Sequence, residues 1–76
     1  IKSVSINAAG SGYTTGDIVT VVGGSSDGLI NILTVNGSGA VLTISINANG
    51  TNYSIANGLS TTGGTGSGFL VNVLIA

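Results

Sequence analysis

The chain contains no cysteine, histidine, proline, methionine or tryptophan among its 76 residues. Without cysteine it forms no disulfide, and without cysteine and histidine it lacks the usual ligands of transition metals. A chain of this length buries only about 60% of its unfolded surface, so small folds commonly depend on disulfides, metal ions or oligomerisation. Oligomerisation is the device that this composition leaves open.

Charge is nearly absent as well. Lys2, Asp17 and Asp27 are the ionised side chains, and the net charge is −1. Such a surface attracts neither nucleic acid nor an anionic membrane, and no apolar stretch reaches the roughly eighteen residues of a membrane span. Because a surface with little charge favours association, we expect the chain itself to be the main partner, with no nucleic acid and no membrane span.

Residues for catalysis are scarce. General acid–base chemistry needs a group that titrates near neutral pH or a tuned pair of carboxyl groups, and a serine nucleophile needs a neighbouring base. Asp17 and Asp27 are the only carboxyl side chains, and turn roles explain them better. Two scattered carboxylates also make a weak calcium site. We therefore expect no enzyme activity, no cofactor and no metal site.

The chain does contain a tandem repeat of one sequence unit. Residues 1–36 overlay residues 41–76 without a gap, and nine of these 36 positions are identical. Fixed-period self-similarity is the sequence signature of a repeat architecture. We expect a single domain over 1–76, made of a first repeat at 1–39 and a second at 40–76. The identical positions in the first copy are Ser5, Ile6, Asn7, Ala8, Gly10, Tyr13, Gly23, Gly24 and Gly28.

Strand signals recur along both copies. Glycine falls too often for helices, and β-branched residues gather in short runs between turns rich in Gly, Asn and Ser. The fold class expected is all-β, with two three-stranded repeats of about 40 residues forming a pseudo-two-fold β-sandwich or small barrel. The predicted strands are 1–7, 17–22 and 28–35 in the first copy and 41–47, 58–62 and 68–75 in the second.

Alternation within these runs predicts which residues face the core. In the strand 41–47, Leu42, Ile44 and Ile46 share one face, and Val4 and Ile6 take the same parity in the first copy. The third strand of each copy is apolar on both faces, which is typical of a strand covered on both sides. A chain this small has little material to cover both faces, so we expect one of them to meet another subunit.

The pattern of strand, GSGYTTGD, strand, GG, short loop and strand resembles glycine-rich tandem repeats of bacteriophage tail and fibre proteins and of some bacterial surface proteins. Nearly the whole chain takes part, although Gly12, Gly16 and Asp17 become Asn52, Ala56 and Asn57 in the second copy. The resemblance implies a structural or adhesive role outside a cell or on a virion. The residues that carry it are Gly10, Ser11, Gly12, Tyr13, Gly16, Asp17, Gly23, Gly24 and Gly28.

The repeat also predicts a mode of assembly. The predicted strand 28–35 runs through Asn36-Gly37 into the strand 41–47, and such a link favours an antiparallel hairpin. By the same logic the segment 68–76 lacks a following strand and the segment 1–7 lacks a preceding one. We therefore expect residues 68–76 of one subunit to pair head to tail with residues 1–7 of the next, giving a ring or a helical filament. The expected interface residues are Ile1, Val4, Ile6, Phe69, Leu70, Val71, Val73, Leu74 and Ile75.

This hypothesis makes the chain a structural protomer of an extracellular or virion filament. Because the chain begins at Ile1 rather than Met, we expect either a removed leader or a fragment of a longer array. Two alternatives stay open: a glycan- or receptor-binding repeat module of a phage tail fibre or surface adhesin, and a plain spacer repeat within a longer stalk.

Sugar could be bound or attached. Tyr13 and Tyr53 are candidate glycan contacts, although tyrosines packed in loops are the more common arrangement. Sequons of the form Asn-x-Ser/Thr begin at three asparagines, and a sugar linked to a hydroxyl group is equally open. The candidate glycosylation residues are Asn36, Asn49, Asn52 and Thr51.

Overall fold

A computed structural model describes all residues of the chain, 1–76, and contains only strands, turns and loops. Six strands follow one another, and each overlaps one of the six predicted runs, although β1 extends four residues beyond the predicted strand 1–7. Their bounds are β1 (Ser3–Ser11), β2 (Ile18–Val21), β3 (Leu29–Val35), β4 (Val41–Ala48), β5 (Ala56–Thr62) and β6 (Ser67–Ile75). The expectation of an all-β fold is confirmed.

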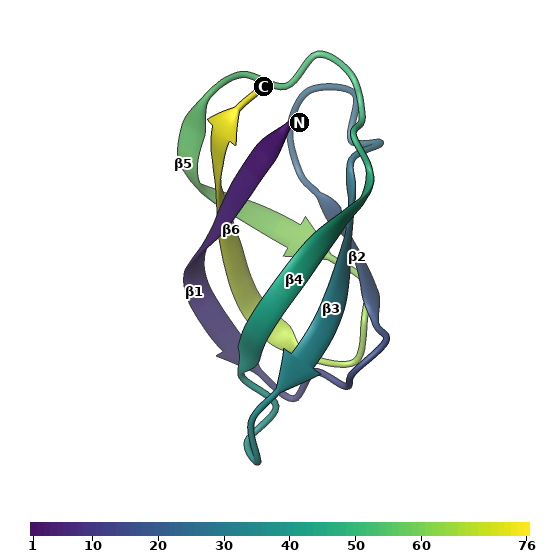
Figure 1. Cartoon of the computed structure of the whole chain (residues 1–76), viewed down its shortest axis with the longest axis vertical. Helices are drawn as coiled ribbons and strands as arrows, with labels where there is room; N and C mark the ends of the chain where they lie inside the picture. Colours follow the sequence, from purple (N-terminus) through teal and green to yellow (C-terminus); the bar gives the residue numbers. More distant parts are fainter.

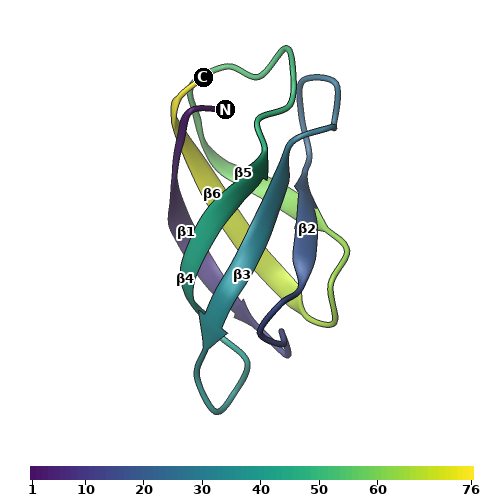
Figure 2. The same cartoon turned by 45° about the vertical axis from the view of Figure 1, so that its right-hand side comes forward.

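The six strands form one antiparallel sheet in the order β1-β6-β5-β2-β3-β4. The sheet rolls up until its two edge strands, β1 and β4, lie side by side (Figures 1 and 2). No hydrogen-bonded ladder joins these two strands, so the fold is a nearly closed barrel measuring 34 × 18 × 16 Å. Of the two predicted architectures, the structure has the small barrel.

Backbone contacts close both ends of the seam between β1 and β4. At one end the backbone nitrogen of Ile1 donates to the carbonyl oxygen of Asn49. At the other, the N–H groups of Gly12 and Tyr13 donate to the carbonyl oxygens of Ser38 and Gly39, at 3.0 and 3.1 Å. Half-buried apolar side chains from both strands, Val4, Ile6, Ile44 and Ile46, pack on the core along the seam.

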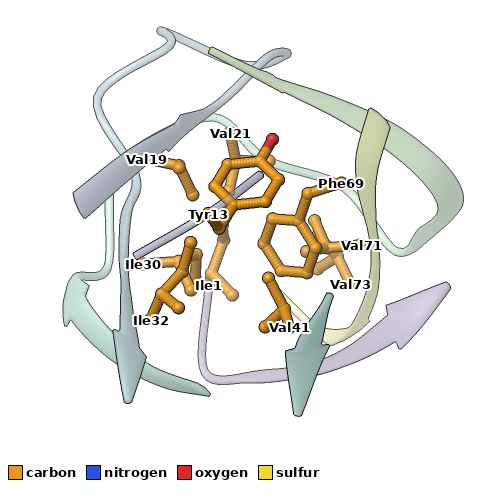
Figure 3. Close-up of a cluster of buried hydrophobic side chains, with 10 residues drawn as sticks. All are labelled: Ile1, Tyr13, Val19, Val21, Ile30, Ile32, Val41, Phe69, Val71 and Val73. Carbon is orange, nitrogen blue, oxygen red and sulfur yellow. The ribbon is translucent and has the colours of Figure 1, made fainter. Parts of the chain in front are cut away.

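The core fills the inside of the barrel (Figure 3). At its centre the rings of Tyr13 and Phe69 meet edge to face, with centroids 5.8 Å apart and planes at 70°. Such a pairing stabilises the fold by roughly 0.5–1.5 kcal/mol beyond the contribution of the apolar area that the rings bury. The buried apolar residues are Ile1, Tyr13, Val19, Val21, Ile30, Ile32, Val41, Phe69, Val71 and Val73.

The β3–β4 hairpin confirms the predicted pairing but corrects one predicted face. Its register skips Leu33 in β3 and Leu42 in β4, so each strand has one residue too many at that point. Such bulges reverse the alternation of side chains along a strand. As a result Val41 is buried, at 2%, whereas Leu42 is 55% exposed. The expectation that Leu42 shares a face with Ile44 and Ile46 is therefore wrong.

Candidate assembly interface

The first and last strands of the chain pair with each other. β1 runs antiparallel to β6, with Ser3 opposite Ile75 and Ser11 opposite Ser67. The premise that segments 1–7 and 68–76 lack a partner within their own chain is therefore wrong. The two segments are complementary, as the repeat predicts, but one chain is long enough to bring both strands together by rolling its sheet.

The predicted interface residues divide into two groups. Phe69, Val71 and Val73 of β6 point into the barrel and are buried, whereas Leu74 and Ile75 are exposed. Leu70 is half-buried. On the side of β1, Ile1 is buried, and Val4 and Ile6 pack against the same core. The inward residues of both strands thus form one continuous apolar contact within the chain.

A glycine lets β1 pass close to β6 near the end of their pairing. Gly10 has φ of +64°, a left-handed conformation that L residues rarely adopt. A Cβ atom on Gly10 would lie 2.5 Å from the carbonyl oxygen of Ser67 and 2.9 Å from Cε2 of Tyr13. The glycine therefore makes room for the tyrosine ring, which folds back beneath the sheet and is 5% exposed.

Asparagine side chains fasten β1 to β6 on the outer surface. Asn72 of β6 donates from Nδ2 to Oγ of Ser5, at 3.3 Å, and accepts at Oδ1 from Nδ2 of Asn7, at 2.8 Å. Its Oδ1 also accepts the backbone N–H of Gly58 in β5, at 2.9 Å. One amide therefore ties together three neighbouring strands.

The β3–β4 pair carries a matching arrangement. Asn31 donates from Nδ2 to Oγ of Ser45, at 3.2 Å, and accepts from Nδ2 of Asn47, at 2.9 Å. Ser45 and Asn47 lie forty residues after their counterparts in β1, but Asn31 and Asn72 do not overlay in the sequence repeat. Neither group follows from the repeat pattern, and the sequence signal for both is an Asn in the middle of each apolar third strand.

The two tyrosines pack within the protein. Tyr13 is buried against Phe69, so no face of its ring is open to a sugar. Tyr53 is half-buried, and its hydroxyl donates to the carbonyl oxygen of Val21, at 2.6 Å, and accepts the N–H of Gly28, at 2.9 Å. These contacts favour the packed interpretation of both residues over glycan stacking.

The candidate glycosylation residues are all exposed on loops. Asn49 has a side chain without hydrogen bonds to the chain, whereas Nδ2 of Asn52 donates to Oγ of Ser25, at 2.7 Å. Oγ1 of Thr51 donates to Asp27, at 3.0 Å, and Asn36 uses its Oδ1 within the β3–β4 turn. Of the four candidate glycosylation residues, Asn49 is thus the one whose side chain makes no hydrogen bond within the chain.

The two carboxylates hold loops together at opposite ends of β2. The backbone N–H of Thr14, followed by the hydroxyl and N–H of Thr65, holds the pKa of Asp17 below its ordinary value. The backbone N–H of Thr51, together with its hydroxyl, likewise lowers the pKa of Asp27. Hydrogen bonds to the charged form favour ionisation. No group of three potential metal-binding side chains occurs in the structure.

Comparisons with protein-family models, with curated proteins and with solved structures find no match. None of the structure's segments is a helix long and apolar enough to cross a membrane. The pairing of the first strand with the last, β1 with β6, is the feature of the structure on which the proposed function rests.

Proposed function

We propose that the chain is a structural protomer of an extracellular or virion filament in which neighbouring subunits exchange β1. In this arrangement β1 of one subunit pairs with β6 of the next subunit. The contacts between them are the same as those between β1 and β6 of one chain in the closed barrel. Exchange of an identical element between protomers is a common route to oligomers, and a head-to-tail order yields a ring or a filament. The location outside a cell or on a virion is proposed from the glycine-rich repeat pattern alone.

The position of β1 at the edge of the sheet carries this proposal. β1 is hydrogen-bonded along its length to β6 only, whereas β6 lies between β1 and β5. Removing β1 from the barrel therefore breaks one ladder, and removing β6 breaks two. For this reason we assign β1 as the donated strand and β6 as the fixed acceptor.

The connection after β1 suits a hinge. Gly12 follows the strand directly and has φ of +79°, and the buried ring of Tyr13 then anchors the chain to the core. The segment that turns is thus confined to Ser11 and Gly12. Hinges are a few residues at the end of an element that absorb a large change of backbone angles.

The strand order supports an origin by duplication. Exchanging each strand for its counterpart forty residues away (β1 with β4, β2 with β5, β3 with β6) turns the order β1-β6-β5-β2-β3-β4 into its own reverse. Under this pseudo-two-fold relation the β6–β1 pair corresponds to the β3–β4 pair. A turn joins β3 to β4, but no turn joins β6 to β1, so the latter pairing can pass from one chain to the next.

A disulfide tests the exchange directly, because the chain has no cysteine of its own. Ser5 faces Asn72 across the β1–β6 pair, and facing residues of antiparallel strands have Cα atoms about 4.5–5.5 Å apart, within the range of a disulfide. The variant Ser5→Cys/Asn72→Cys is assembled under reducing conditions, examined by electron microscopy and then oxidised. We expect filaments and, on a non-reducing denaturing gel, a ladder of covalent multimers.

The β3–β4 pair offers a matched control. Asn31 faces Ser45 in the same way, so Asn31→Cys/Ser45→Cys in the same filaments should give a single-chain band. Filaments of the first variant that also give only single chains would show assembly without strand exchange. Absence of any filament or ring would refute the structural role itself.

A further inference from the structure

Three asparagines are followed directly by glycine, at Asn36, Asn49 and Asn57. In this sequence the backbone nitrogen of the glycine, which no side chain shields, can attack the amide carbon of the asparagine. The three sites differ in two respects in the structure. One is whether the glycine N–H is held by another group, and the other is whether the asparagine amide oxygen receives hydrogen bonds.

Asn36 begins the turn between β3 and β4, at the end of the barrel opposite the two termini (Figure 1). Its amide oxygen Oδ1 accepts the backbone N–H of Ser38 at 2.8 Å and that of Ala40 at 3.0 Å. The turn itself is fixed by two further bonds, from Asn36 N–H to the Ala40 oxygen and from Gly39 N–H to the Asn36 oxygen. Gly37 is exposed, and its N–H donates to no group of the chain.

We propose that Asn36 is a site of self-catalysed deamidation, in which the hairpin turn serves as an oxyanion hole for its own side chain. Attack by the Gly37 nitrogen on Cγ places negative charge on Oδ1, where two backbone N–H groups already point. Donors aimed at a developing oxyanion accelerate acyl chemistry, and removing one of them costs roughly 10²–10³ in rate. At Asn36 both donors are already hydrogen-bonded, before any reaction, to the oxygen atom that would take up the charge.

The reaction needs only water as co-reactant. The Gly37 nitrogen loses its proton to water or hydroxide as the N–Cγ bond forms, and collapse of the intermediate breaks the bond from Cγ to the side-chain nitrogen, which takes a proton from water and leaves as ammonia. The resulting succinimide ring is opened by one water molecule at either of its two C–N bonds. The product at position 36 is an aspartyl or isoaspartyl residue, and each adds one negative charge to a chain whose net charge is −1.

The other two sites lack this combination. The N–H of Gly58 donates to Oδ1 of Asn72 at 2.9 Å, which holds the nucleophile at Asn57 within strand β5. The N–H of Gly50 is free, but the side-chain amide of Asn49 accepts no hydrogen bond from the chain. We therefore expect Asn36 to react fastest, Asn49 more slowly and Asn57 slowest of the three.

The two isomers have different effects on the barrel. The aspartyl product keeps the backbone, and its carboxylate can accept the same two N–H groups in charge-assisted bonds. The isoaspartyl product inserts a methylene group into the main chain beside the Val35–Val41 pair that closes the hairpin. The chemistry is independent of filament assembly, so its test is independent as well.

The test compares the folded chain with the same chain in denaturant at mildly alkaline pH, with each site followed by peptide mapping and tandem mass spectrometry. At Asn36 folding should raise the rate at least about tenfold, since the donors exist only in the folded turn, whereas at Asn57 it should lower the rate. Gly37→Ala is the matched variant, because its methyl group would meet no atom within 4 Å; it should fold normally and deamidate more slowly at Asn36. A folded rate at Asn36 equal to or below the denatured rate would overturn the proposal.

Discussion

Removing the hydroxyl group of Tyr53 should destabilise the barrel, whereas the same change at Tyr13 should not. The two residues occupy equivalent positions of the repeat. The hydroxyl of Tyr53 makes two hydrogen bonds, to the Val21 oxygen and from the Gly28 N–H, at 2.6 and 2.9 Å. No group of the chain bonds to the hydroxyl of Tyr13. Tyr53→Phe therefore leaves one donor and one acceptor without partners in a partly buried site.

The size of the effect follows from these two bonds. Each contributes a net 0.5–1.5 kcal/mol, so we expect Tyr53→Phe to lower the free energy of unfolding by about 2 kcal/mol and Tyr13→Phe by less than about 0.5 kcal/mol. In a domain of this size about 1 kcal/mol shifts Tm by roughly 4–8 °C. The difference in Tm between the two variants should thus be roughly 10 °C.

Circular dichroism during thermal and urea unfolding measures this difference, at concentrations where the wild-type chain is monomeric. Coincident transitions from both probes are needed for a two-state free energy. Equal losses of stability in the two variants would refute the reasoning, because the two hydrogen bonds of the Tyr53 hydroxyl would then add nothing to stability beyond what a hydroxyl without such bonds provides. A larger loss for Tyr13→Phe would contradict it outright.

Two other predictions concern acid and glycine. The pKa values of Asp17 and Asp27 are lowered in the folded state, so their contribution to stability is complete above the ordinary value of 3.8 and is lost as the pH falls through the folded values. Tm should stay nearly level above about pH 5 and fall below about pH 4, and Asp17→Asn/Asp27→Asn should remove most of that fall; an unchanged acid profile would contradict this. Gly50→Ala should lower Tm strongly, because Gly50 has φ of +69° and a Cβ atom there would lie 2.5 Å from a ring atom of Tyr53. Gly37→Ala is the control. Equal Tm values for the two variants would show that the barrel accommodates the crowding at position 50.

The strands were predictable because their signals are local. Runs such as 28–35 and 68–75 combine β-branched residues with flanking glycines, and the structure has strands at Leu29–Val35 and Ser67–Ile75. The β3–β4 hairpin was predictable for the same reason, since the turn Asn36–Gly37 lies between the two strands it joins. Local sequence therefore predicts both a strand and, where a short turn follows, the strand that pairs with it.

The pairing of β1 with β6 was not predictable in this way. Its residues lie more than fifty positions apart, and no turn signal connects them. The repeat showed that the two strands are complementary but not whether they belong to one molecule or to two. That choice depends on how far the sheet curls, which follows from twist and side-chain packing over all six strands.

Bulges are a second feature that the alternation of apolar residues does not predict. Leu33 and Leu42 fit the apolar pattern of their strands, yet both are outside the barrel because each is the extra residue of a bulge. Period-2 reasoning fails at such points, because one extra residue reverses every following side chain. Leu74 of β6 is likewise skipped between Ser3 and Val4, and is also exposed.

The proposed filament would keep the β1–β6 contact of the closed barrel, so the two forms differ in how β1 is connected rather than in what it contacts. Within one chain β1 is tethered, and a short tether gives an effective concentration of the order of millimolar, which favours the closed form in dilute solution. We expect the exchanged form to be favoured at high chain concentration, or when the hinge at Ser11 and Gly12 does not readily adopt the turn that returns β1 to its own barrel. If the proposed filament forms, the closed barrel and the filament are two states of the same chain, and the chain concentration and the hinge, rather than the core, set the balance between them.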